Sequence, residues 1–315
     1  KVINILIDRF LKDVDEVGSM PWQQPYKRYN SINYVSMKPY RGINRLLLPF
    51  GEYLTANQIN TINKEKGEDY KFKKGIKWYP VSYYSTNEKP ATEKEVLVLA
   101  SWGFDINEYG YISQDSYWSY YKTENGYVKR RSILRYYMVA DRHDFVNSRG
   151  EILPSRFELG DVELTLSKPK EVIDRYVATS KVKVSYDHNG SPYYSPQSDK
   201  VYLNPHHISE EEYFSTAFHE FAHSTGAEDR LCRKSIVTNN KGLYAIEECI
   251  AEIAAYLCCS ECGISSFVTS GTKQYSNSAA YVHYWKERVR DFGGKLLSIC
   301  SQADQAFNYI FGEEI

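Results

Sequence analysis

The sequence predicts an α+β fold in two domains, the first mixing sheet with helix and the second dominated by helices. The chain has 315 residues, which suffices for two domains with sizeable cores. A stretch from about 147 to 168 mixes Gly, Pro and Ser with charged residues, as linkers do. Helical patterns dominate beyond it, and one of them carries a histidine pair. We therefore place the domains at 1–150 and 169–315, joined by a linker at 151–168.

The composition is that of an ordinary globular protein. The net charge of −1 argues against a uniformly basic coat for nucleic acid. Tyrosine is the outlier, with 29 residues, many of them in the first half. Tyrosines can fill sheet faces or stack against unpaired bases, and both roles stay open.

The first domain begins with a segment that predicts an amphipathic helix. Residues 2–11 are apolar but interrupted by Asp8 and Arg9, and no small-residue cleavage site follows, so the segment does not resemble a signal peptide. No stretch reaches the length of a membrane span. We therefore expect a cytoplasmic protein without a membrane partner.

The rest of this domain should alternate short helices and strands. The expected elements are an extended segment at 20–26, a helix from Thr55, its cap, to Asn63, a basic hairpin-like segment at 71–79, a strand at 81–85, a tyrosine-rich insertion or elaborated sheet at 86–130, and a strand at 131–141.

The second domain should start with a helix from Pro169, which suits a first turn, to about Ser180. Ser209 is expected to cap a helix that runs to about Thr225 and ends at Gly226. Short strands are expected at 183–186, 193–194 and 200–203, and further helices at 243–262, 278–291 and 295–311.

Residues 219–223 form an HExxH motif. On a helix, the four-residue step places His219 and His223 on one face, one turn apart, where two imidazoles can share a zinc ion. Glu220 lies where its carboxylate can act as general base on a metal-activated water. The alternative is a pair of histidines hydrogen-bonded within a buried helix.

A catalytic zinc ion needs a third protein ligand and an open position. The next predicted helix contains Glu247, Glu248 and Glu252 among apolar residues, and buried carboxylates are costly unless they are paired or bind a cation. We therefore assign Glu248 as the third ligand and Glu252 as a hydrogen-bond partner of a ligand histidine. The alternative is that Glu247 and Glu252 lie at the surface.

Two histidines and a carboxylate suit zinc, with manganese as an alternative. The six cysteines lie in the last third and form no disulfide framework, so buried free thiols are expected, although Cys258 and Cys262 could hold a second metal. Tyr244 and His283 are candidates for stabilising an oxyanion. The strand at 200–203 could pair with an extended substrate.

Longer motifs make the chain resemble the ArdC-type antirestriction proteins of conjugative plasmids and related mobile elements. In the first half the resemblance rests on Met20-Pro21-Trp22, Pro25, Tyr40 to Asn44, the run to Leu48 and Lys74-Gly75. In the second half it rests on Tyr193 to Pro196, Asp199, His219 to His223, Thr225-Gly226, Arg230-Leu231, Tyr244-Ala245, Glu247, Glu248, Ala251, Glu252, Asn277, Ala280-Tyr281 and Trp285.

The resemblance implies a first domain that binds single-stranded DNA and a second, zincin-like metallopeptidase domain with a gluzincin-like ligand set. It implies a role in protecting incoming DNA from host restriction, with single-stranded DNA and an unknown protein substrate, such as a host restriction component, as partners. Basic side chains interleaved with aromatic ones suit such DNA binding. The DNA-contact candidates by this likeness are Trp22, Arg41, Asn44, Lys73, Lys74 and Lys77.

Two departures from the family pattern stand out. Ser224 follows the second histidine, where the family usually has tryptophan, and the 86–130 segment is longer and richer in tyrosine.

Two functions compete for this chain. One is a DNA-associated zinc metallopeptidase, and the other is a non-catalytic single-stranded-DNA-binding protector whose metal domain is structural or docks a protein.

Overall fold

The computed structural model describes residues 2–18, 31–49, 51–101, 111–112, 118–123, 126–156, 168–206, 209–236, 240–264 and 279–312. They fold into two compact units. One unit holds residues 3–79 and 139–315, and the other is Pro80–Met138. Most of the predicted linker, 151–168, lies outside the described residues, so the domain boundaries stay a prediction. The predicted α+β class is confirmed.

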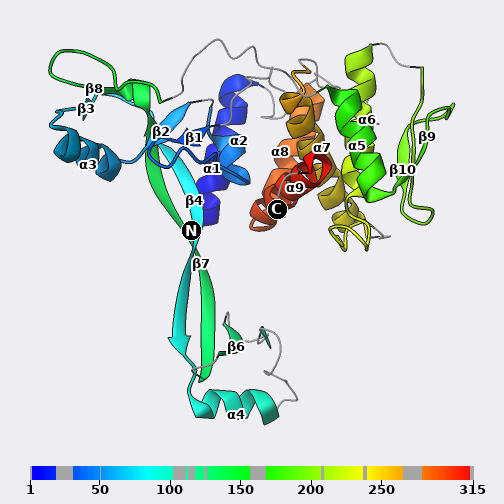
Figure 1. The fold of residues 1–315 in the computed structure, drawn as a ribbon, viewed down its shortest axis with the longest axis horizontal. Coiled ribbons are helices and arrows are strands. Elements are labelled where there is room, and N and C mark those ends of the chain that lie inside the picture. The colour runs from blue at the N-terminus through cyan, green and yellow to red at the C-terminus, as the bar shows by residue number, and fades with distance from the viewer. Residues whose placement is uncertain are drawn as a thin grey trace. The chain divides into compact units, whose positions relative to one another are not determined.

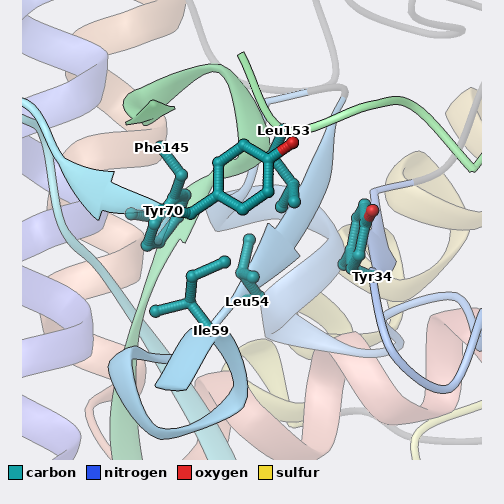
Figure 2. Close-up of a cluster of buried hydrophobic side chains, with 7 residues drawn as sticks. Tyr34, Leu54, Ile59, Tyr70, Phe145 and Leu153 are labelled. Atoms are coloured by element: carbon teal, nitrogen blue, oxygen red, sulfur yellow. The ribbon is translucent and has the colours of Figure 1, made fainter. Parts of the chain in front are cut away.

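The N-terminal part of the first unit is a small sheet with helices. β1 (Ile32–Asn33) pairs in parallel with β2 (Glu52–Leu54), and β2 pairs antiparallel with the end of β7 (Gly126–Asp141). Figure 2 shows the core of this part, where tyrosine rings and aliphatic side chains from separate segments meet. The labelled side chains are Tyr34, Leu54, Ile59, Tyr70, Phe145 and Leu153.

Two helices of this part were predicted correctly. α1 (Val2–Val17) is amphipathic and buries residues at four-residue spacing, including Leu6, Phe10 and Val14. α3 (Ala56–Lys66) begins after Thr55, whose hydroxyl accepts a hydrogen bond from the Gln58 N–H while the Gln58 side chain binds the Thr55 N–H. This capping box is a local signal, which is why the sequence sufficed to place the helix.

The predicted hairpin at 71–79 is wrong. β3 (Lys71–Phe72) pairs antiparallel with β8 (Phe145–Val146), more than seventy residues along the chain, and Tyr79 already begins β4 (Tyr79–Pro90). A short 3-10 turn, η2 (Arg142–Asp144), leads into β8. The partner of β3 is non-local, and nothing in the 71–79 segment identifies it.

The second unit is a long two-stranded ribbon with a small cap. β4 pairs with β7, and α4 (Glu93–Ser101) lies at one end of the ribbon (Figure 1). β7 also pairs with β6 (Ser119–Thr123), which pairs with β5 (Tyr111–Ile112). Tyr120 is buried here against Val96 and Trp118. The predicted elaborated sheet at 86–130 is therefore present, but its helix was missed.

The C-terminal part of the first unit is helical. α5 (Pro169–Ser180) has the predicted bounds, and α6 (Glu210–Ser224) packs against α7 (Lys241–Glu261). α7 also packs against α9 (Lys295–Phe311), which contacts α8 (Ala279–Phe292) (Figure 1). This packing puts α7 in the middle of the helical layer, which buries almost all of its faces.

A three-stranded sheet lies against α6. Its order is β10 (Tyr193–Ser195), β11 (Lys200–Tyr202), β9 (Lys183–Ser185), so β11 has a partner on each side. The prediction that the 200–203 strand could pair with a substrate is therefore wrong, because its backbone groups are already bonded on both edges.

Candidate metal centre

α6 carries the HExxH motif, and local signals define both of its ends. The Ser209 hydroxyl accepts a hydrogen bond from the Glu212 N–H, and acidic residues fill the first turn, where the helix dipole favours anions. The helix ends at Ser224, two residues before Gly226. His219, Glu220 and His223 are all buried.

The two imidazoles converge through one nitrogen each. The distance between His219 Nε2 and His223 Nε2 is 3.1 Å. α7 brings Glu248 to the same point, with its carboxylate oxygens 3.7 Å from His219 Nε2 and 3.5 Å from His223 Nε2. These three residues form a group, within the described residues, whose ligand atoms lie within 4.8 Å of one another. The predicted third ligand therefore lies beside the predicted pair.

This geometry fits a divalent metal ion. Two nitrogens bound to one zinc ion at about 2.0–2.1 Å in a tetrahedral arrangement lie about 3.3 Å apart, close to the observed separation. Two nitrogen donors and one carboxylate are a ligand set that zinc and manganese both accept. The Glu248 side chain is 29% exposed, whereas those of the two histidines are buried more deeply, so the open side of the centre is at Glu248.

Each histidine has a carboxylate at its other ring nitrogen. Glu252 Oε2 lies 3.4 Å from His219 Nδ1, and Glu247 Oε1 lies 3.3 Å from His223 Nδ1. Glu247 is only 2% exposed and Glu252 only 3%. The alternative that these two glutamates lie at the surface is wrong. Glu252, predicted as a hydrogen-bond partner of a ligand histidine, faces His219, and Glu247 faces His223 in the corresponding position, which was not predicted.

The charges of the centre are strongly coupled. Burial disfavours a charged imidazole at His219, but Glu248 and Glu252 outweigh burial and raise the pKa of His219. Burial also disfavours the Glu248 carboxylate, yet the two histidines hold the pKa of Glu248 at about 2. Glu248 is therefore ionised and available as a ligand at neutral pH.

Tyr244 is on the open side of the centre. It is 59% exposed and precedes Glu248 by one helical turn, and its hydroxyl hydrogen-bonds the Glu248 carboxylate. Burial of the hydroxyl, together with Glu248 and Glu220, raises the pKa of Tyr244, so the hydroxyl keeps its proton. His283, the other oxyanion candidate, is exposed and faces Glu287 at 3.6 Å.

Comparison with known proteins accounts for most of the chain. Residues 1–139 match the N-terminal domain of the anti-restriction factor ArdC, and residues 171–299 match a zincin-like metallopeptidase domain. The chain is an ArdC-type protein. Its two matched domains occur in the order that the sequence motifs predicted.

Crystal structures of the antirestriction protein ArdC from plasmid R388 have the same fold as this ArdC-type protein. The metal-free structure is 22% identical, with a TM-score of 0.62 and coverage of 99% of each chain. The Mn(II)-bound structure is 21% identical, with a TM-score of 0.62 and coverage of 98% of this chain and 97% of that one.

Sequence relatives of this ArdC-type protein include an uncharacterized protein, y4eC, of Sinorhizobium fredii, 21% identical over 95% of this chain and 88% of the relative. A DNA primase TraC of Escherichia coli is 24% identical over 95% of this chain, which covers only 19% of the primase. A second TraC primase is 22% identical, and the chain covers 26% of it. The chain thus spans about a quarter or less of the primases.

Several residues of the family motifs in this ArdC-type protein make hydrogen bonds around the end of α6 and are not part of the candidate metal centre. The Arg230 guanidinium pairs with Asp199 and donates to the Ser224 carbonyl oxygen, while the Tyr194 hydroxyl donates to Asp199 at 2.8 Å. Ser224, the departure from the family pattern, is fully buried, and its hydroxyl bonds the Tyr176 hydroxyl at 2.7 Å. The Ser224 hydroxyl also donates to the Phe221 carbonyl oxygen at 2.7 Å, so both of its partners are protein groups.

The DNA-contact candidates of this ArdC-type protein fall in two places, and Trp22 lies outside the described residues. Arg41 is exposed just before α2 (Ile43–Leu47), which contains the partly buried Asn44. The neighbouring Gly42 N–H donates to Asp304 of α9, so this motif is anchored to the helical layer. Lys73 and Lys74 are exposed after β3.

Lys77, the remaining candidate, has acidic neighbours. Its ammonium group lies 3.3 Å from Asp13 and 3.5 Å from Glu16, both on α1, and 5.4 Å from the centre of the Tyr79 ring. Two carboxylates already offset its charge, so Lys77 is a weaker anchor for phosphate than Lys73 or Lys74.

Four of the cysteines, Cys249, Cys258, Cys259 and Cys300, are almost fully buried as free thiols, and burial raises their pKa values. Cys258 and Cys262 do not form a metal-binding group with a third His, Cys, Asp or Glu anywhere in the part of the chain that the structure describes. Within that same part, no helix is both long and apolar enough to cross a membrane.

Proposed function

We propose that this ArdC-type protein is an antirestriction factor that binds single-stranded DNA and carries a metal-dependent peptidase site. One observation supports the peptidase site above all: His219, His223 and Glu248 converge at one point, and Glu220 follows the first ligand directly. The ArdC domain match and the similarity to an antirestriction protein and to DNA primases support the antirestriction and DNA-associated role.

In this proposal, His219, His223 and Glu248 hold the metal ion. An ion held there would act as a Lewis acid, which would polarise a peptide carbonyl and lower the pKa of water. Glu220 takes the proton from the attacking water and passes it to the leaving amine. Tyr244 lies on the open side, where its protonated hydroxyl can donate a hydrogen bond to the oxygen that becomes negatively charged. Zinc is the proposed metal, and manganese is the alternative, since the ArdC protein of plasmid R388 has a Mn(II)-bound crystal structure.

The proposed DNA-binding residues are Arg41, Asn44, Lys73, Lys74 and Lys77, together with Trp22. Exposed cations attract the phosphates of the strand, and exposed aromatic rings can stack on its bases. The proposed protein substrate is a host restriction component, and the proposed location is the cytoplasm. The competing proposal is a protector that needs only the DNA-binding half.

Replacing both Lys73 and Lys74 with alanine is expected to weaken binding to a single-stranded oligonucleotide and to flatten its salt dependence. Each lost phosphate contact removes about 0.7 from the slope of log K against log salt, so the double variant should lose about 1.4. Fluorescence anisotropy across a salt series measures the slope. Lys77→Ala should change the slope less, because Asp13 and Glu16 already neutralise that charge.

The matched control is the Lys168→Ala/Lys170→Ala variant, which removes the same charge at the start of α5 and should leave the slope unchanged. An unchanged slope in the Lys73→Ala/Lys74→Ala protein would contradict the placement of the DNA surface.

A protection assay of single-stranded DNA against a restriction enzyme then separates the peptidase proposal from the non-catalytic protector. Protection that survives Glu220→Gln but not the lysine change favours the non-catalytic protector.

A further inference from the structure

The carboxylates that face the Nδ1 atoms of the two ligand histidines, Glu252 and Glu247, differ in their other contacts. Glu252 faces His219 from the same helix, α7, that carries Glu248. Glu247 faces His223 and is also bound by a loop that follows α6. The loop residues concerned are Arg233 and Ser235, and both are buried.

Glu247 accepts hydrogen bonds at both oxygens. Its Oε1 is 2.6 Å from the Arg233 Nη2 and 3.3 Å from His223 Nδ1. Its Oε2 is 3.1 Å from the Arg233 Nε and 2.5 Å from the Ser235 hydroxyl. A bidentate arginine pair of this kind fixes a carboxylate in the plane of the guanidinium. A guanidinium stays protonated in proteins, so the carboxylate that Arg233 binds at both oxygens is an anion.

An ionised carboxylate can only accept hydrogen bonds. The bond to His223 therefore requires the proton to be on Nδ1, which leaves the lone pair of Nε2 free. Nε2 is the nitrogen that faces His219 and Glu248. Glu247 thus selects the tautomer of His223 that a metal ion at this point needs.

Arg233 is itself held rigidly by the end of α6. Its Nη2 donates to the Ala222 carbonyl oxygen at 2.8 Å, and its Nη1 donates to the Thr225 hydroxyl at 2.7 Å. Gly226 leaves room for it, because a β-carbon there would lie 2.9 Å from the Arg233 Nη2. The glycine after the helix is therefore part of the arrangement that lets the guanidinium reach Glu247.

We propose that Glu247, held by Arg233 and Ser235, is a positioning residue that fixes the tautomer and ring orientation of His223 for metal binding. The proposal rests on the metal site of the proposed function but does not require peptidase activity. Stability alone is a weak reason for this arrangement, because a buried ion pair seldom stabilises a fold more than apolar residues of similar volume.

The test is the metal affinity of purified Glu247→Gln, measured by competition for Zn²⁺ with a chromophoric chelator. Glutamine keeps the size of the side chain but removes the charge and lets the position donate as well as accept. We expect a loss of affinity of about 10–100-fold, the usual effect of changing a partner of a ligand histidine. Gly226→Ala displaces Arg233 without removing a polar group and should lower the affinity by a smaller factor.

The matched control is Asp199→Asn, which makes the same carboxylate-to-amide change in the other arginine pair at the end of α6. It should lower the melting temperature and leave Zn²⁺ affinity within twofold of the wild type. Folded Glu247→Gln with wild-type affinity, or an equal loss in Asp199→Asn, would overturn the positioning role. A wild-type protein that binds no Zn²⁺ would instead refute the metal site itself.

A measurement on the wild type needs no variant. Long-range ¹H–¹⁵N spectra of the Zn²⁺-loaded protein should show His223 protonated at Nδ1 and metal-bound through Nε2. The reverse assignment would overturn the inference even where the variants fail to fold.

Discussion

Replacing Glu220 with glutamine is expected to reduce peptide hydrolysis by a factor of about 10²–10⁴ and to leave the metal content unchanged. The amide keeps the shape of the buried side chain but cannot accept the proton that a general base must take from water. Hydrolysis of a fluorogenic peptide library by the Zn²⁺-loaded protein, beside elemental analysis of the same samples, measures both quantities.

The control for Glu220→Gln is Glu212→Gln, the same change at another buried glutamate of α6. It should retain hydrolysis and metal. A fully metal-loaded Glu220→Gln protein with unaltered hydrolysis would remove the catalytic role from Glu220. Absence of hydrolysis in the wild type with every peptide, together with intact DNA protection, would favour the non-catalytic protector.

Replacing Glu248 with alanine is expected to reduce metal affinity by more than the roughly 10–100-fold that changes at outer partners cause. Its carboxylate is the donor that α7 contributes between the two histidines, and alanine leaves only two protein ligands. Elemental analysis of the purified variant should show metal well below one equivalent.

The control for this variant is Glu261→Ala, which makes the same change at the far end of α7 and should keep its metal. Stoichiometric metal in Glu248→Ala, with an affinity equal to that of the wild type, would exclude Glu248 as a ligand. The helix itself should persist, since most of α7 is apolar and buried.

Elements with local signals were predictable from the sequence. Pro169 at the first turn, Thr55 with Gln58, and Ser209 before three glutamates each specify a helix start within a few residues. The HExxH spacing likewise predicts that both imidazoles share a face, and their Nε2 atoms do converge. Glu248 could be chosen because a carboxylate in an apolar helix needs a partner.

Features that depend on distant partners were not predicted. The hydrogen bonds of β3 are made to β8, and no residue near 71–79 indicates that pairing. Glu247 is buried because Arg233, fourteen residues earlier, reaches it from a loop. A sequence signal for this pair was nevertheless present. α7 is apolar on nearly all faces, so Glu247 needed a partner just as Glu248 and Glu252 did.

We propose that His219, His223 and Glu248 are the protein ligands of one metal ion. X-ray absorption spectroscopy of the Zn²⁺-loaded wild type tests it most directly, because nitrogen and oxygen ligands lie at about 2.0–2.1 Å from zinc and sulfur at about 2.3 Å. We expect a first coordination sphere of nitrogen and oxygen only, with the multiple scattering of two imidazole rings. A sulfur ligand, or a single imidazole, would contradict the assignment.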